Sequence, residues 1–245
     1  MFWQIELEGD IALLRELSLT IATPQLQIVQ EDERFYLESN QLETQMSYSE
    51  IGALSEVLLG ALNGVIRLTN PKTNPVISRG FHKVRDDGKK EIATWIKGIG
   101  LLGSPSIAVQ VYDADGKLVQ AKPPADPKPI WLILALSDTA VSKALRLFGK
   151  TTNDHDWVGL YRIFEVIKDD VGTQLMYAKG WATKAAITNF TRTANHPDAA
   201  GDDARHGATN DQPPTNPMAL SDARSLIELL LHRWLDHKSN STPHD

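Results

Sequence analysis

The chain has 245 residues, 42% of them hydrophobic and 23% charged, and its formal net charge is −6. These values are typical of a soluble globular protein with one large domain or two small ones. The acidic balance argues against a broad nucleic-acid or membrane footprint, although it permits a local basic patch. Because the chain contains no cysteine, disulfides and thiolate metal sites are excluded.

The N-terminal residues, MFWQIELEGD, carry acids where a signal peptide has a basic region and lack a cleavable apolar core. The longest apolar run, Ile130 to Leu136, is far shorter than the ~20 residues of a membrane helix. We therefore predict a cytoplasmic protein that does not enter a membrane.

The first half begins with patterns of strand, helix and hairpin. Phe2 to Leu7 alternates as a strand, and Asp10 can cap a helix that runs through Leu19. Two strand-like runs, Leu26 to Val29 and Arg34 to Glu38, are separated by a charged turn and predict a hairpin.

A long helix capped by Ser47 or Ser49 should follow and end near Asn70-Pro71. Its apolar stripe consists of Ile51, Leu54, Leu58, Leu62 and Val65. Three further strand-like runs are Val76 to Val84, Glu91 to Lys97 and Ser106 to Tyr112. The first half is therefore predicted to be an α+β domain, an antiparallel sheet with one long helix.

A proline-rich segment separates the halves, since Gln120 to Pro129 contains four prolines. We accordingly predict an α+β domain over residues 1–120, a linker over 121–130, an all-α domain over 131–238 and a disordered tail over 239–245.

The second half shows mostly helical patterns. Ile130 to Leu136 is either a buried strand or the start of a helix, because so short a run has no decisive periodicity. Helices are predicted from Ser137-Asp138 to Gly149, from Trp157 to a stop at Gly172, from Thr183 to about Asn195, and from Ala219 to Leu235. Trp234 and Leu230 should pack against the helix that starts at Trp157.

Residues 189–207 hold an unusual concentration of polar groups: two His, two Arg, two Asn and three Asp. Asn189, Arg192 and His196 would share one helix face, with His196 at the helix end before Pro197. Such a set could cleave RNA without a metal, with His196 moving a proton and Arg192 stabilising charge on phosphorus. Asn195, Arg205 and His206 are candidate binding residues beside this catalytic set.

A structural interpretation of the same stretch stays open. Asn195 could cap the helix, His196 could bond a carbonyl, and Asp202 or Asp203 could hold Arg205. The stretch would then be a structural latch.

The second half, roughly Ser137 to Asp236, resembles the HEPN-type helical domains of bacterial toxin and phage-defence RNases. It is also similar to the C-terminal domains of uncharacterised bacterial proteins that carry A-N-H-P…G-D-D-A-R-H-G. HEPN nucleases place an Arg or Asn a few residues before a His at a helix end. Asn189 and His196 fit that spacing, whereas Arg192 and the Arg205-His206 pair depart from it.

The resemblance implies a homodimer that completes its site from two copies, with RNA as substrate or ligand. The resulting hypothesis is a metal-independent RNase or RNA-binding protein of a bacterial defence or toxin type. The alternative is a non-catalytic interaction or regulatory protein with a HEPN-like body.

Three other motifs favour structural interpretations. The string Gly98 to Gly103 matches G-x-G-x-x-G, but a β-type run follows it where a dinucleotide site needs a helix. His196-Pro197-Asp198 is the tripeptide of J-domains, yet the preceding helix lacks their basic character. His232 and Asp236 form an isolated i,i+4 pair. We therefore predict no cofactor and no metal.

Overall fold

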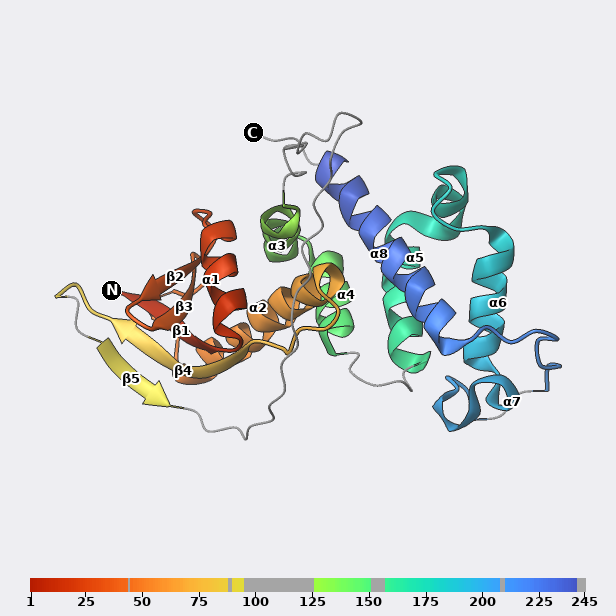
Figure 1. Cartoon of the computed structure of the whole chain (residues 1–245), viewed down its shortest axis with the longest axis horizontal. Helices are drawn as coiled ribbons and strands as arrows, with labels where there is room; N and C mark the ends of the chain where they lie inside the picture. Colours follow the sequence, from red (N-terminus) through yellow and green to blue (C-terminus); the bar gives the residue numbers. More distant parts are fainter. Residues whose placement is uncertain (44, 88–89, 95–125, 151–156, 208–209, 242–245) are drawn as a thin grey trace, which may run out of the picture. The chain divides into compact units, whose positions relative to one another are not determined.

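The computed structural model describes residues 1–43, 45–87, 90–94, 126–150, 157–207 and 210–241 (Figure 1). The chain divides into two compact units, the first made of Met1–Ser55 and Asn70–Ile130 and the second of Glu56–Thr69 and Trp131–Asp245. An α+β fold is followed by a helical one, which confirms the predicted fold class. The strand predicted at Ser106 to Tyr112, the Gly98 to Gly103 string and residues 121–125 of the proposed linker lie outside the described residues.

The N-terminal unit contains an antiparallel sheet of five strands in the order β2-β3-β1-β4-β5. The strands are β1 (Phe2–Glu8), β2 (Leu26–Glu31), β3 (Arg34–Ser39), β4 (Ile77–Val84) and β5 (Lys90–Thr94). Registers Ile5↔Leu37 and Gln4↔His82 place the central strand β1 between β3 and β4. The predicted hairpin is confirmed, since β2 and β3 pair across a turn in which Asp32 has a positive φ of 52°.

Two helices accompany the sheet. Helix α1 (Ile11–Thr20) begins where predicted, because Asp10 accepts a hydrogen bond from the Leu13 amide. Helix α2 (Tyr48–Thr69) begins after Ser47, whose hydroxyl and amide exchange bonds with Glu50 in a capping box. The Trp3 ring on β1 meets the ring of Tyr48, the first residue of α2, edge-on, so the start of α2 packs against the sheet.

The remaining turns of α2, Glu56–Thr69, belong to the second unit. There the backbones of α2 and α4 (Thr139–Lys150) come so close that glycines occupy the crossing. A Cβ on Gly60 would lie 2.8 Å from the Arg146 side chain, and one on Gly149 would lie 2.9 Å from the Gly64 nitrogen. One helix therefore contributes to both units.

Helix α2 is also the one described helix that is long and apolar enough, by length and composition, to cross a membrane. Its most apolar window is 56% buried inside the protein, as expected for a core helix.

The second unit is helical throughout its described part. Its elements are α3 (Lys128–Ser137), α4, α5 (Trp157–Ala178), α6 (Lys184–Asn195), α7 (Pro197–Ala200), η1 (Gly201–Asp203) and α8 (Leu220–Ser241). Ile130 to Leu136 is thus helical, which resolves the open alternative. Gly172 breaks α5 with φ 71° and ψ 153°, at the predicted stop.

Helix α8 packs on α5 as predicted, with Trp234 and Leu230 both fully buried. The Trp234 indole nitrogen donates to an Asp170 carboxylate oxygen at 2.7 Å. The helix is longer than expected, because residues 239–241, predicted to lie in a tail, form its last turn.

Candidate functional site

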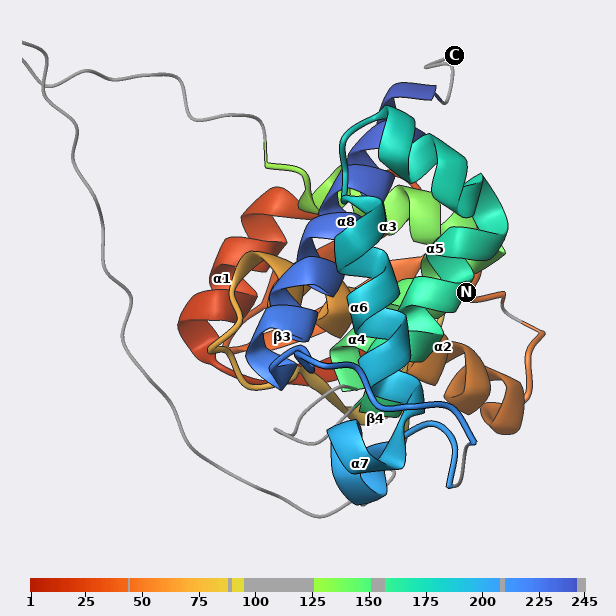
Figure 2. The same ribbon diagram turned by 90° about the vertical axis from the view of Figure 1, so that its right-hand side faces the viewer.

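The polar stretch, residues 189–207, begins in the last two turns of helix α6 and continues beyond its C-terminus. The helix starts next to the predicted first residue, Thr183, whose hydroxyl caps the helix by accepting a hydrogen bond from the Ala186 amide at 3.1 Å. It ends at Asn195, because Pro197 forces His196 into an extended conformation with ψ 120°. The chain then turns through α7 and η1 and returns past the end of α6 towards α8 (Figure 2).

His196 is the best-held residue of the stretch and is only 6% exposed. Its Nδ1 accepts a hydrogen bond from the Asp198 amide at 3.1 Å, so this imidazole is the N-cap of α7. The proton therefore sits on Nε2, which donates to the Asp211 carbonyl oxygen at 2.9 Å. Both ring nitrogens are bonded to main-chain groups of the returning loop.

Arg192 and Asn189 lie on the preceding turns of α6. The Arg192 side chain is exposed, and its Nη2 donates to the Gln212 carbonyl oxygen at 3.1 Å. A small pocket of about 110 Å³ lies beside it, lined by Thr191, Arg192, Asn195, His196, Asp211 and Gln212. Asn189 is half-buried and does not line this pocket. The structure therefore brings Arg192 and His196 together at one pocket but leaves Asn189 outside it.

Arg205 returns to the helices and is held at several points. Its amide donates to the Ala194 carbonyl oxygen at 2.8 Å, and its Nη2 lies 3.0 Å from Glu165 Oε1 on α5. The guanidinium also lies over the Tyr161 ring, 4.5 Å from its centroid. Glu165 is thus a carboxylate partner of Arg205 that the sequence analysis, which named Asp202 or Asp203, did not foresee.

An aromatic stack lies under this arginine. Tyr161 is stacked on Phe190 at 5.9 Å between ring centroids, and Arg205 covers it as well. The Asn195 Nδ2 lies 3.5 Å from the Tyr161 hydroxyl. His206 is exposed and has one long contact, 3.5 Å from its Nε2 to an Arg205 nitrogen. Asn195 is therefore half-buried against Tyr161, Arg205 contacts α5 with its side chain 36% exposed, and His206 faces solvent.

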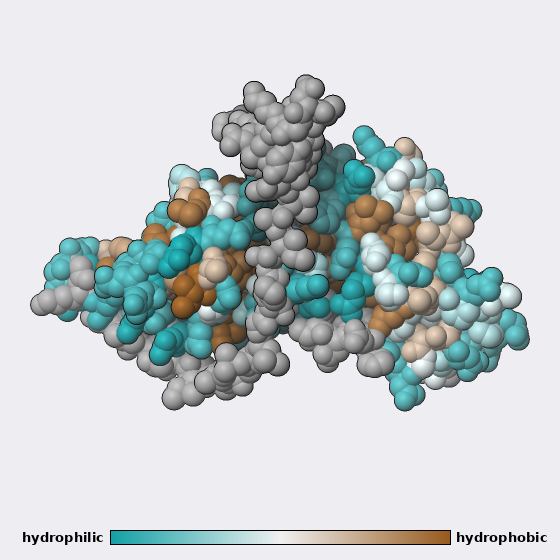
Figure 3. Space-filling model, viewed as in Figure 1, coloured by the Kyte–Doolittle hydropathy of each residue, from teal (hydrophilic) through white to brown (hydrophobic). Residues whose placement is uncertain are grey.

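The electrostatic balance of the returning loop is acidic. Residues 189–212 contain the guanidinium groups of Arg192 and Arg205 against four carboxylates, those of Asp198, Asp202, Asp203 and Asp211. The Asp198 side chain is 78% exposed. The surface at this end of the unit is correspondingly hydrophilic (Figure 3). A phosphate group would meet more negative than positive charge here.

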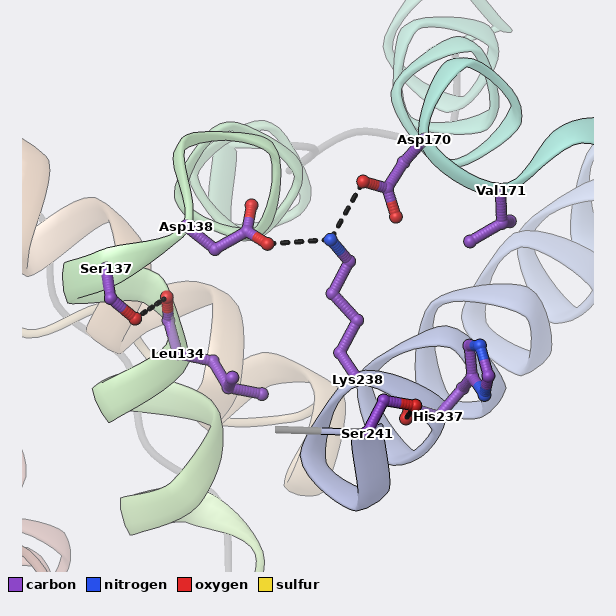
Figure 4. A pocket seen from close by; sticks show the side chains of 8 residues that line it. All are labelled: Leu134, Ser137, Asp138, Asp170, Val171, His237, Lys238 and Ser241. Atoms are coloured by element: carbon purple, nitrogen blue, oxygen red, sulfur yellow. Dashed lines mark hydrogen bonds and ion pairs between the residues drawn. The ribbon is translucent and has the colours of Figure 1, made fainter. Parts of the chain in front are cut away.

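A second charged group was missed by the sequence analysis and centres on Lys238 of α8. Its ammonium lies 2.6 Å from Asp138 Oδ2, at the junction of α3 and α4, and 2.8 Å from Asp170 Oδ1 on α5 (Figure 4). Asp138 also caps α4 by accepting from the amides of Ala140 and Val141. The Lys238 side chain therefore connects α8 to α5 and to the junction between α3 and α4.

The charges of this group are fixed by their mutual contacts. Burial raises the pKa of Asp138, but the hydrogen bonds from Lys238 and the α4 amides outweigh it and lower the pKa overall. Burial lowers the pKa of Lys238, and its bonds to Asp138 and Asp170 raise that pKa by more. The residues lie 68 and 100 positions apart in the chain, so no local pattern could have revealed them.

A buried polar group on the sheet was also missed. His82 Nε2 lies 2.7 Å from Glu6 Oε2, and Gln4 donates to Glu31 and Glu38 at 2.9 and 2.7 Å. Burial raises the pKa of Glu31, but the hydrogen bonds from Lys90 and Gln4 lower that pKa by more, so it lies below its ordinary value. Gln4 and Glu6 of β1 and His82 of β4 are all buried. The residues of this group bond to one another across strands and hold the sheet together.

No arrangement of three or more His, Cys, Asp or Glu side chains suited to a metal occurs among the described residues. His232 of the i,i+4 pair packs edge-on against Trp131 at 5.0 Å, and its Nε2 lies 3.4 Å from the Leu68 carbonyl oxygen. Its role in the described structure is therefore packing.

No protein-family model, no curated protein and no solved structure matches the chain. The HEPN resemblance therefore remains a prediction, and function has to be argued from the chain's own geometry.

Proposed function

We propose that the second unit is a non-catalytic interaction module in which residues 189–207, together with 210–212, form a structural latch. The observation that carries this proposal is the state of His196. Its two ring nitrogens are bonded to the Asp198 amide and the Asp211 carbonyl, and its side chain is 7% exposed. A general acid or base needs a ring nitrogen within hydrogen-bond reach of the reacting proton.

The neighbouring contacts support the same proposal. Arg192 and Arg205 both bond to groups of the protein, one to a loop carbonyl and one to Glu165. The loop is acidic overall, which disfavours a polyanionic substrate. An RNase built on His196 would need the loop to release both nitrogens before each turnover.

A cleavage assay with two variants tests the proposal. Single-stranded RNA is incubated with the wild-type protein, His196→Asn and His196→Ala. Asparagine can still cap α7 by accepting from the Asp198 amide, although it cannot act as an acid or base. We expect no cleavage by any of the three proteins, with full helical content by circular dichroism in His196→Asn. Wild-type cleavage that disappears in His196→Asn would overturn the proposal.

RNA binding without cleavage is a second candidate, favoured by the exposed guanidinium of Arg192 beside the 110 Å³ pocket. A salt titration of single-stranded RNA binding tests it, with Arg192→Gln compared with Arg162→Gln on the exposed side of α5. RNA binding through the pocket predicts a loss in the first variant alone. Equal binding by the two variants would exclude this candidate.

The predicted HEPN-like homodimer is tested separately by light scattering. A dimer that persists at low micromolar concentration would support the resemblance. A monomer would count against the resemblance, because a HEPN site is completed by residues from two copies.

A further inference from the structure

A cavity of about 400 Å³ lies beside Lys238 within the second unit (Figure 4). This volume is within the range of small-molecule sites, which is roughly 300–1,000 Å³. Leu134 and Val171, which lie on opposite sides of Lys238 in Figure 4, supply apolar walls, and Ser137, His237 and Ser241 supply polar groups. The cavity thus combines an apolar surface with a few convergent polar groups, as ligand sites do.

Two helix C-termini converge on this cavity. Ser137 is the last residue of α3, and Val171 is the last residue before the Gly172 break in α5. Each helix C-terminus carries a partial negative charge of roughly half an electron. The N-terminus of α4 also lies there, but the Asp138 carboxylate already caps it. The helix ends therefore make the cavity negative.

Among the described residues, the carboxylates and the ammonium that line the cavity do not cancel this field. Asp138 and Asp170 carry two negative charges, Lys238 supplies one positive charge between them, and the other titratable side chain in the lining is His237. Both carboxylate oxygens that face Lys238 have further lone pairs with which to accept a hydrogen bond. A second cation is therefore the charge that the cavity lacks.

We propose that this cavity binds a small organic cation, an alkylammonium whose N–H groups donate to Asp138 and Asp170 and whose carbon chain lies on Leu134 and Val171. The carbon chain distinguishes such a ligand from an inorganic cation, because it buries apolar surface against the walls. The ammonium distinguishes it from a neutral alcohol of the same length. Neither the latch nor RNA binding is needed for this site.

Calorimetric titration of the full chain with butane-1,4-diamine tests the proposal, with 1-butanol and sodium chloride as probes that lack one feature each. We expect saturable diamine binding below about 10 mM, near the weak end of measurable affinities. Asp170→Asn should weaken binding at least tenfold, because it removes a charge at close range while still accepting from Trp234. Asp138→Asn should act likewise, since asparagine is also a good N-cap.

Asp169→Asn is the matched control, because Asp169 is exposed and does not line the cavity. Ser241→Phe, at an exposed position on the cavity edge, should block binding without changing the charge. The proposal is overturned if no diamine binds, if butanol or sodium binds as well, or if Asp169→Asn weakens binding as much as Asp170→Asn. Normal binding by Ser241→Phe would place the ligand elsewhere and would also overturn it.

Discussion

The latch at residues 189–207 and 210–212 and the Lys238 group are both polar regions of the same helical unit, but their side chains bond to different partners. In the latch, His196 and Arg192 bond to main-chain carbonyls or amides. Around Lys238, charged side chains bond to one another and leave a cavity of about 400 Å³ beside them. Side chains that satisfy backbone groups hold a loop, whereas side chains that meet across helices can line a binding site.

A segment with many potentially reactive side chains therefore need not offer them to a ligand. The 189–207 stretch has the more suggestive sequence, yet the pocket beside it measures about 110 Å³. Lys238 lies in an unremarkable polar segment near the chain end, yet it lines the larger cavity. Substitutions at the two regions should therefore differ in size and in kind.

The largest effect is expected at Trp234, which donates a hydrogen bond to Asp170 and whose ring lies under the Lys238 ammonium. Trp234→Ala should lower the free energy of unfolding by about 4 kcal/mol, because a fully buried ring is replaced by a cavity. Trp234→Phe keeps most of the ring but loses the bond to Asp170, and should cost about 1–2 kcal/mol. Urea unfolding measures both. A change below about 0.5 kcal/mol for Trp234→Ala would mean that α8 is not part of the core.

The next effect is expected at Lys238 itself. Lys238→Met should cost about 2 kcal/mol, because it leaves two partly buried carboxylates facing each other without a cation. Lys168→Met on the exposed side of α5 is the matched control and should be close to neutral. Equal effects in the two variants would show that the Lys238 contacts contribute nothing.

The pH dependence of this difference follows from the two pKa shifts. Asp138 has a lowered pKa in the folded state, so its contribution is present above the unfolded pKa of about 3.9 and is lost as the pH falls through the folded value. Lys238 has a raised pKa, so its contribution is present below about pH 10.4 and is lost above the folded value. The difference between wild type and Lys238→Met should be constant from about pH 5 to 9 and shrink outside that window.

Local features of the fold were predictable from the sequence because their causes are local. Asp10 and Thr183 cap helices through bonds to amides three residues on. The β2–β3 hairpin follows from two alternating runs around a short charged turn. Gly172 interrupts α5 because its positive φ is open to glycine and costly for other residues.

The features that were not predicted depend on distant partners. Nothing in the sequence indicates that Lys238 meets Asp138. The sequence allowed His196 to bond a carbonyl, but it did not indicate that this carbonyl belongs to Asp211, 15 residues further along the chain. The assignment of Glu56–Thr69 to the second unit depends on glycines at the α2–α4 crossing. The spacing of Gly60 and Gly64 was a signal for close helix packing that the periodicity analysis passed over.

At the latch, His196→Ala should cost about 1–2 kcal/mol, because it removes the α7 cap and the bond to Asp211. His196→Asn should recover about half of that loss, since it restores the cap alone. Native-state hydrogen exchange at the Asp198 amide distinguishes them, with faster exchange in the alanine variant only. Equal exchange in both would show that the cap is not what holds α7.

The smallest effect is expected at Arg205, whose side chain is 36% exposed. Its ion pair with Glu165 is exposed and should contribute less than about 1 kcal/mol, and the stacking on Tyr161 adds roughly 0.5–1 kcal/mol. Arg205→Lys keeps the charge but loses the planar group that stacks on Tyr161, so it should retain only the contribution of the ion pair with Glu165, which salt screens. Arg205→Gln loses the charge and should show no salt dependence at this site. If both variants unfold at the wild-type urea midpoint, the main-chain bond from the Arg205 amide to Ala194 holds the loop without help from the side chain.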